Sequence, residues 1–81
     1  MIKNEVIEIT QDEALTSIPD DREKIHCMIE SSFGFLGADW SKDRVVDLIK
    51  NSKRIAWADN MFEHNLAIIN DGKLYTFDIK K

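Results

Sequence analysis

Apolar and polar residues alternate most clearly between Phe62 and Ile79, and this stretch predicts a β-hairpin. Asp71-Gly72 at its centre is a favoured pair for a two-residue type I′ turn, because both turn positions need a positive φ. Counting outward from this turn pairs Asn65 with Asp78 and His64 with Ile79. The same count gathers the apolar side chains on one face, namely Leu66, Ile68, Tyr75, Phe77 and Ile79. A slip of one residue would mix the two faces, so the turn and the pattern favour one register.

A shorter alternation over Glu5–Thr10 predicts a half-buried strand. Thr10 and Glu13 then have the spacing of a capping box, which predicts a short helical turn through Leu15.

The segment from Ser17 to Gly34 predicts a longer helix. Ser17 can cap it, and Pro19 falls in the first turn, where a missing N–H costs little. Its apolar residues recur at helical spacing, namely Ile18, Ile25, Met28, Ile29 and Phe33. Gly34 would end the helix in a left-handed cap.

Phe33–Gly37 reads as an apolar turn in which Phe35 and Leu36 fill the gap between two helices. Asp39 or Ser41 would cap the second helix. The buried stripe of that helix would comprise Val45, Leu48 and Ile49, and the helix would end at Asn51-Ser52.

Arg54–Ala58 predicts a strand with Ile55 and Trp57 on one side, followed by a turn at Asp59-Asn60. The expected fold is one α+β domain over residues 1–81, with element order β-α-α-β-β-β. A C-terminal three-strand meander and the N-terminal strand form a small antiparallel sheet, with two helices on one face. One edge strand is left free and could pair with another chain, including a second copy in a homodimer.

A chain of 81 residues is too short to build a deep, water-excluding active site easily, whereas a binding surface is within its reach. The single cysteine, Cys27, excludes an internal disulfide. No apolar run reaches transmembrane length and no signal-peptide core follows Met1, so we expect a cytoplasmic protein without a membrane partner.

The net charge of −4 is distributed unevenly along the chain. Residues 1–40 carry nine acids against three bases, a net −6, and residues 41–81 carry eight bases against six acids, a net +2. Such an acidic half repels phosphate and attracts a basic partner.

Cys27, His64 and Asp78 are the residue types of a thiol triad. The segment from His64 to Asp78 resembles the His-bearing strand pair of papain-like hydrolases and deamidases, which implies a Cys–His thiol hydrolase as one alternative. The predicted register opposes this alternative, because it places His64 and Asp78 on opposite faces. A mid-helix Cys27 also lacks the helix N-terminus that lowers the pKa of such a nucleophile.

No metal or cofactor is expected. His26 and Cys27 are adjacent and would diverge by about 100° on a helix, which makes them poor ligands for one ion. Gly34 and Gly37 fit neither the dinucleotide-binding nor the phosphate-loop spacing.

A nucleic-acid-binding module is a second alternative. Its basic strip would comprise Lys42, Arg44, Lys50, Lys53, Arg54 and Lys73. Trp40 or Trp57 could stack a base. The acidic balance of the whole chain opposes this interpretation.

The favoured interpretation is a non-enzymatic module that binds a larger protein with a basic surface. In size, acidity and lack of catalytic motifs the chain is similar to small inhibitors encoded by phages and toxin–immunity cassettes. The resemblance implies an inhibitor or regulator that acts by steric occlusion. Aromatic residues at element ends would anchor the partner and acids would steer it. The expected contact residues are Asp12, Glu13, Asp20, Asp21, Glu23, Phe35 and Trp40.

Overall fold

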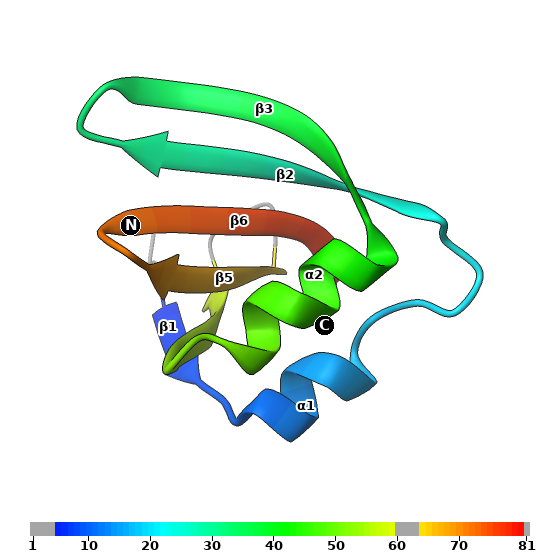
Figure 1. Cartoon of the computed structure of the whole chain (residues 1–81). Helices are drawn as coiled ribbons and strands as arrows, with labels where there is room; N and C mark the ends of the chain where they lie inside the picture. Colours follow the sequence, from blue (N-terminus) through cyan, green and yellow to red (C-terminus); the bar gives the residue numbers. More distant parts are fainter. Residues whose placement is uncertain (1–4, 60–63, 81) are drawn as a thin grey trace.

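The computed structural model describes residues 5–59 and 64–80, which form six strands and two helices (Figure 1). The strands are β1 (Glu5–Glu8), β2 (Lys24–Ser31), β3 (Gly34–Ser41), β4 (Arg54–Asp59), β5 (His64–Asn70) and β6 (Lys73–Lys80). The helices are α1 (Gln11–Thr16) and α2 (Lys42–Lys50). The predicted turn at Asp59-Asn60 and the aromatic Phe62 fall wholly or partly outside the described residues.

The strands form one antiparallel sheet in the order β1-β4-β5-β6-β2-β3. The predicted α+β class is confirmed, and so is the C-terminal meander, which is β4-β5-β6. The N-terminal strand joins this meander beside β4. The predicted four-stranded sheet is wrong, because β2 and β3 extend the sheet beyond β6.

The β5–β6 hairpin turns at Asp71 and Gly72, whose φ angles of 54° and 73° are those of the predicted type I′ turn. The predicted register is confirmed from Asn70–Lys73 as far as the pair of Leu66 with Phe77. A register shift follows, and Asn65 pairs with Lys80. The predicted pairs Asn65–Asp78 and His64–Ile79 are therefore wrong, because a β-bulge with extra residues on β6 interrupts the ladder between Phe77 and Lys80.

The long helix predicted from Ser17 to Gly34 is wrong, because residues 24–31 form strand β2. Ile25 and Cys27 point into the core, whereas His26 and Met28, which follow each of them in the chain, are exposed. This alternation has the two-residue period of a strand. Met28 is an apolar residue on the open face of the sheet, and counting it with the core residues gave the misleading helical spacing.

The apolar turn predicted at Phe33–Gly37 is also wrong. Residues 34–41 form strand β3, which pairs with β2 along its whole length. Gly34 has a φ of 116° at the start of β3, and the Ser31 hydroxyl accepts a hydrogen bond from the Phe33 N–H. Gly34 therefore serves the turn of a hairpin, where the sequence predicted a helix cap.

Both helices begin at a hydroxyl cap. The Thr10 hydroxyl accepts the Glu13 N–H at 3.1 Å, which confirms the predicted cap of α1. The Ser41 hydroxyl accepts the Arg44 N–H at 3.3 Å at the start of α2. Ser17 ends α1, so its predicted role as the cap of a second helix is wrong.

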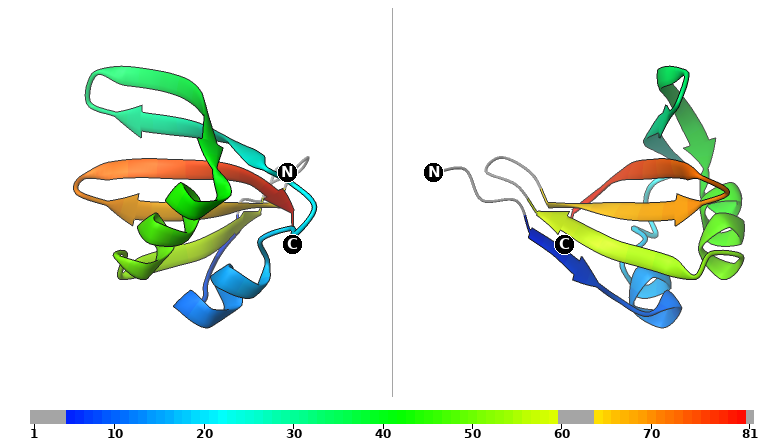
Figure 2. Two further views of the ribbon diagram at one scale, coloured as in Figure 1. Left: turned by 45° about the vertical axis from the view of Figure 1, so that its right-hand side comes forward. Right: turned by 90° about the vertical axis from the view of Figure 1, so that its left-hand side faces the viewer.

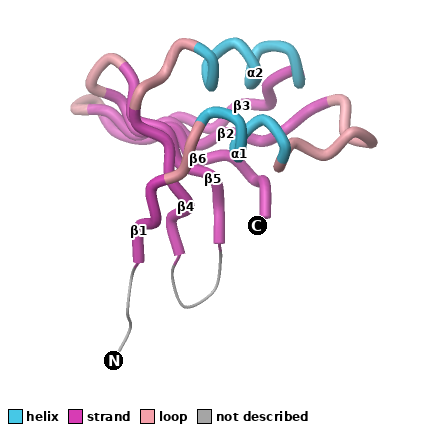
Figure 3. Tube along the Cα trace, turned by 90° about the horizontal axis from the view of Figure 1, so that it is seen from below, coloured by secondary structure: helices cyan, strands magenta, loops and turns pink. Residues whose placement is uncertain are grey.

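The two helices cover one face of the sheet, as the two turned views show (Figures 2 and 3). The core between them contains Ala14, Ile18, Ile25, Cys27, Trp40, Val45, Ile49, Ile55, Trp57, Leu66, Ile68, Phe77 and Ile79. Trp40 packs edge-on against Tyr75 and Phe77, with ring centroids 5.6 and 5.4 Å apart. The helices leave the other face of the sheet open over the part of the chain that the structure describes.

Candidate functional site

The β2–β3 hairpin carries three of the four most exposed large apolar side chains among the described residues. Phe33 at its turn is 99% exposed, and Phe35 and Leu36 on β3 are 72% and 64% exposed. Phe35 lies opposite Glu30 on the open side of the sheet, whereas Leu36 lies opposite Ile29 on the helix side. The predicted role of Phe35 and Leu36 as a plug between helices is wrong, because both residues belong to strand β3, lie on its opposite faces and are exposed.

β3 is an edge strand, since β2 is its only neighbour in the described sheet. Its eight residues contain no Lys and no Pro, and Asp39 is its single charged residue. Lysine, proline and short length are the usual features that stop an edge from pairing with another chain. The backbone of β3 therefore offers a row of donors and acceptors to an extended segment.

Three of the predicted acidic contact residues flank the base of this hairpin. The Glu23 carbonyl accepts the Lys42 N–H at 3.3 Å, and the Lys42 Nζ lies 3.2 Å from an Asp20 carboxylate oxygen. These contacts hold the loop with Asp20, Asp21 and Glu23 beside the junction of β3 and α2. All three side chains are exposed.

Asp12 and Glu13 lie elsewhere, in the first turn of α1. The Gln11 side chain donates to the Ser52 carbonyl at 2.9 Å, which ties the start of α1 to the end of α2. The predicted acidic patch is thus divided into two groups, and one of them adjoins the hairpin.

Trp40 is 6% exposed and belongs to the core. The Arg44 guanidinium stacks over its ring, with the guanidinium carbon 4.1 Å from the ring centroid. This stacking and the two aromatic contacts anchor the base of β3 to α2 and β6. Trp40 therefore packs in the core beneath the hairpin, and its side chain is not part of the exposed surface.

The open side of the hairpin carries a His26–Asp39 pair, with the ring Nδ1 3.0 Å from a carboxylate oxygen. A side chain at Gly37 would bring its Cβ within 3.4 Å of the His26 ring, so the glycine leaves room for that ring. A hollow of about 450 Å³ adjoins this pair, lined by His26, Met28, Asn65, Thr76, Phe77 and Asp78. Cys27 points to the opposite, buried face and takes no part in it.

Cys27 and Asp78, two of the three residues of the alternative thiol triad, have unrelated surroundings. Cys27 lies in the middle of β2, buried in the core, and this burial raises its pKa from 9.0 to about 11, against a smaller lowering by Arg44. The Asp78 carbonyl accepts from Arg22 at 2.7 Å, and its carboxylate lies 3.7 Å from the same guanidinium. The side chain of His64 falls outside the described residues. The raised pKa disfavours the thiolate that a nucleophile requires.

Three of the six residues in the predicted basic strip make contacts within the chain. Lys42 pairs with Asp20, Arg44 stacks on Trp40, and Arg54 lies 3.9 Å from Glu8. Lys50, Lys53 and Lys73 are exposed on α2, on the loop after it and beside the β5–β6 turn.

No group of three or more His, Cys, Asp or Glu side chains suited to a metal occurs in residues 5–59 and 64–80. Within the same residues, neither helix is long and apolar enough to cross a membrane.

Phe33 and Leu36 are surface residues that the sequence analysis missed. Two glycines interrupt their stretch, which then reads as a turn. The signal that could have revealed them is the alternation of Ile25, Cys27 and Ile29 on the partner strand. Comparison with protein-family models, with curated proteins and with solved structures found no match to this chain.

Proposed function

We propose that this chain is a non-enzymatic protein-binding module that inhibits or regulates a larger protein by steric occlusion. The observation that carries the proposal is the β2–β3 hairpin, where an unprotected edge strand coincides with exposed Phe33, Phe35 and Leu36. An extended segment of the partner pairs with β3, and its apolar side chains pack against these three residues.

The charges beside the hairpin specify the partner further. Glu30 and Asp39 lie on the open side of the hairpin, and Asp20, Asp21 and Glu23 adjoin its base. An extended segment that carries Lys or Arg beside apolar residues complements this surface, and the acids raise its rate of association.

The apolar side chains supply most of the affinity in this proposal. Burying a Phe or Leu side chain that was exposed stabilises a complex by roughly 1.5–3 kcal/mol before the costs of association. Aromatic side chains are common among residues that dominate binding energies. We therefore expect Phe35 and Leu36 to matter more than any single acid.

The test is affinity capture of the tagged full chain from a source-cell lysate, with and without nuclease, followed by mass spectrometry. The wild type is compared with the double variant Phe35→Ser, Leu36→Ser and with the control Val6→Ser, which alters an exposed apolar residue on the opposite edge strand. We expect one stoichiometric protein that survives nuclease and is lost with the double variant alone.

Two results would contradict the proposal. Partners that disappear with nuclease would favour nucleic-acid binding through Lys50 and Lys53. A protein partner that both variants retain would show that binding does not use the hairpin.

A further inference from the structure

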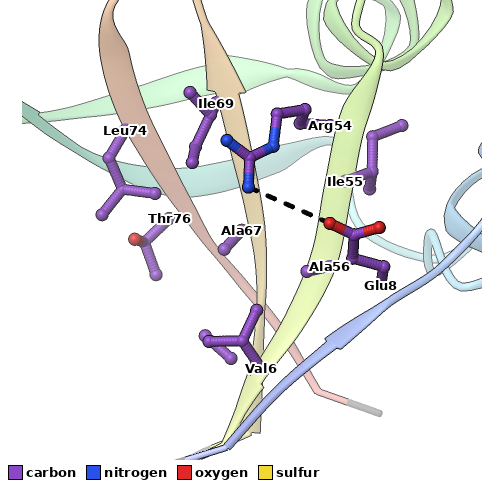
Figure 4. A pocket seen from close by; sticks show the side chains of 10 residues that line it. Val6, Glu8, Arg54, Ile55, Ala56, Ala67, Ile69, Leu74 and Thr76 are labelled. Atoms are coloured by element: carbon purple, nitrogen blue, oxygen red, sulfur yellow. Dashed lines mark ion pairs between the residues drawn. The ribbon is translucent and has the colours of Figure 1, made fainter.

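The open face of the sheet has a hollow of about 250 Å³ whose floor is made of small side chains (Figure 4). Ala56 on β4 pairs with Ala67 on β5, which pairs with Thr76 on β6. These three residues are the middle of a row that continues to Glu8 on β1 and to Met28 on β2. The middle of the row is a shallow trough, because its side chains are shorter than those of the next row.

The next row toward the β5–β6 turn is a ridge that we call the 54–30 row. Arg54 pairs with Ile69, Ile69 with Leu74, and Leu74 with Glu30. Paired residues point to the same face of a sheet, so these four side chains lie side by side on the open face. Ile69 is 44% exposed, and Arg54 and Glu30 at the two ends are exposed.

We propose that a second copy of this chain covers the open face in a two-fold symmetric dimer, with the axis between Ile69 and Leu74. The order of these four residues carries the proposal, since it reads cation, apolar, apolar, anion, with Phe35 of β3 lying beyond Glu30. A two-fold rotation about an axis along the strands reverses the row. It places Ile69 against the partner's Leu74 and Arg54 against the partner's Glu30.

The charge pattern selects a copy of the same chain over an arbitrary partner. The row is neutral in a chain of net charge −4, so the two rows meet without net repulsion between them. Each Arg54–Glu30 contact occurs twice, as an isologous interface requires. In the single chain Arg54 lies 3.9 Å from Glu8, a long surface ion pair that is easily exchanged.

The size of the face is sufficient for such a dimer. Six strands about 4.8 Å apart, each about 20 Å long, present roughly 600 Å² per copy. Two faces together bury roughly 1,200 Å², which is the lower end of the range for specific interfaces. Sheets stacked in this way lie about 10 Å apart, so the 54–30 rows of the two copies can meet side chain to side chain.

This dimer leaves the backbone edge of β3 open but covers Glu30 and Phe35, which the proposed partner also contacts. The purified chain contains no partner, so a failure of the dimer is distinguishable from a failure of the proposed function. Sedimentation equilibrium of the purified full chain over a concentration series tests the dimer. We expect a reversible monomer–dimer equilibrium for the wild type and a monomer for Ile69→Asp.

The charges provide a sharper test. We expect Arg54→Glu and Glu30→Arg each to raise the dissociation constant about tenfold, because each reversal creates two like-charge contacts. The double reversal should return it to within about threefold of the wild type. Asp47→Arg, an exposed charge reversal on α2, is the matched control and should change little. A wild type that stays monomeric at millimolar concentration, or a double reversal that does not restore association, would overturn the proposal.

Discussion

Cys27 shows how one residue can separate two functional interpretations. Its side chain is buried on the helix side of β2, and desolvation raises its pKa to about 11, with Arg44 opposing that shift. At neutral pH the side chain is therefore a protonated thiol. A thiol enzyme requires the reverse, which is a lowered pKa and access to solvent.

We expect Cys27 in the folded protein to react with iodoacetamide at pH 7.5 far more slowly than a free thiol, and to react rapidly in urea. The unfolded thiol ionises near pH 9.0, below the folded one at about 11. The free energy of unfolding should therefore fall as the pH rises from about 9 to 11. Mass spectrometry of the alkylated chain measures the rates, and rapid labelling without urea would contradict the buried position.

Local chemistry made several single residues predictable. Asp71-Gly72, Thr10 and Ser41 have the roles expected of them, because a turn or a cap depends on a few adjacent atoms. Ser17 does not have its expected role as an N-cap, since a serine can end one helix as readily as it begins another. Its N–H donates to carbonyls of α1.

At the scale of elements, β2 and β3 determine the architecture. They add two strands to the meander and present an edge and a hairpin beyond the helices (Figure 1). The orientation of β2 follows from alternation, with Ile25 in the core and Met28 on the open face.

Substitutions in β2 distinguish a strand from a helix. We expect Ile25→Val to lower the free energy of unfolding by about 1 kcal/mol, because it removes a methylene from a closed core. Met28→Thr should change it by less than about 0.5 kcal/mol, because an exposed strand position suits threonine. Urea denaturation measures both, and a larger loss for Met28→Thr than for Ile25→Val would contradict the strand.

The elements differed in how far the sequence could predict them. The meander has a strong turn and clean alternation, and its register is correct up to the bulge at Asn65. In β2 the exposed apolar residue Met28 obscures the alternation of Ile25, Cys27 and Ile29, and β3 is interrupted by Gly34 and Gly37. Their strand state depends on pairing with β6 and with each other, which is tertiary information.

At the scale of the whole molecule, charge and apolar exposure meet at the hairpin. The loop with Asp20, Asp21 and Glu23 adjoins the base of β3, while Phe33 lies at the opposite end. The sequence predicted the acids and Phe35, because charge and aromatic content can be read directly. It could not predict that Trp40 would enter the core, since that depends on how α2 and β6 pack around it.

Reversal of Asp20, Asp21 and Glu23 to Lys should slow association with the captured partner and reduce its salt dependence together. The physical reason is the loss of long-range attraction to a basic segment. Stopped-flow or surface-binding kinetics at two salt concentrations measure both quantities. Reversal of Asp12 and Glu13 on α1 is the matched control. If this reversal slows association as much as the reversal in the loop, the loop does not steer the partner specifically.

Amide hydrogen exchange of the full chain, free and with the captured partner, tests binding at β3 most directly. We expect protection to rise along residues 34–41 and to stay unchanged along residues 5–8, because the partner adds a strand beside β3. Protection confined to β1 or to the helices, with β3 exchanging as in the free chain, would contradict binding at this edge.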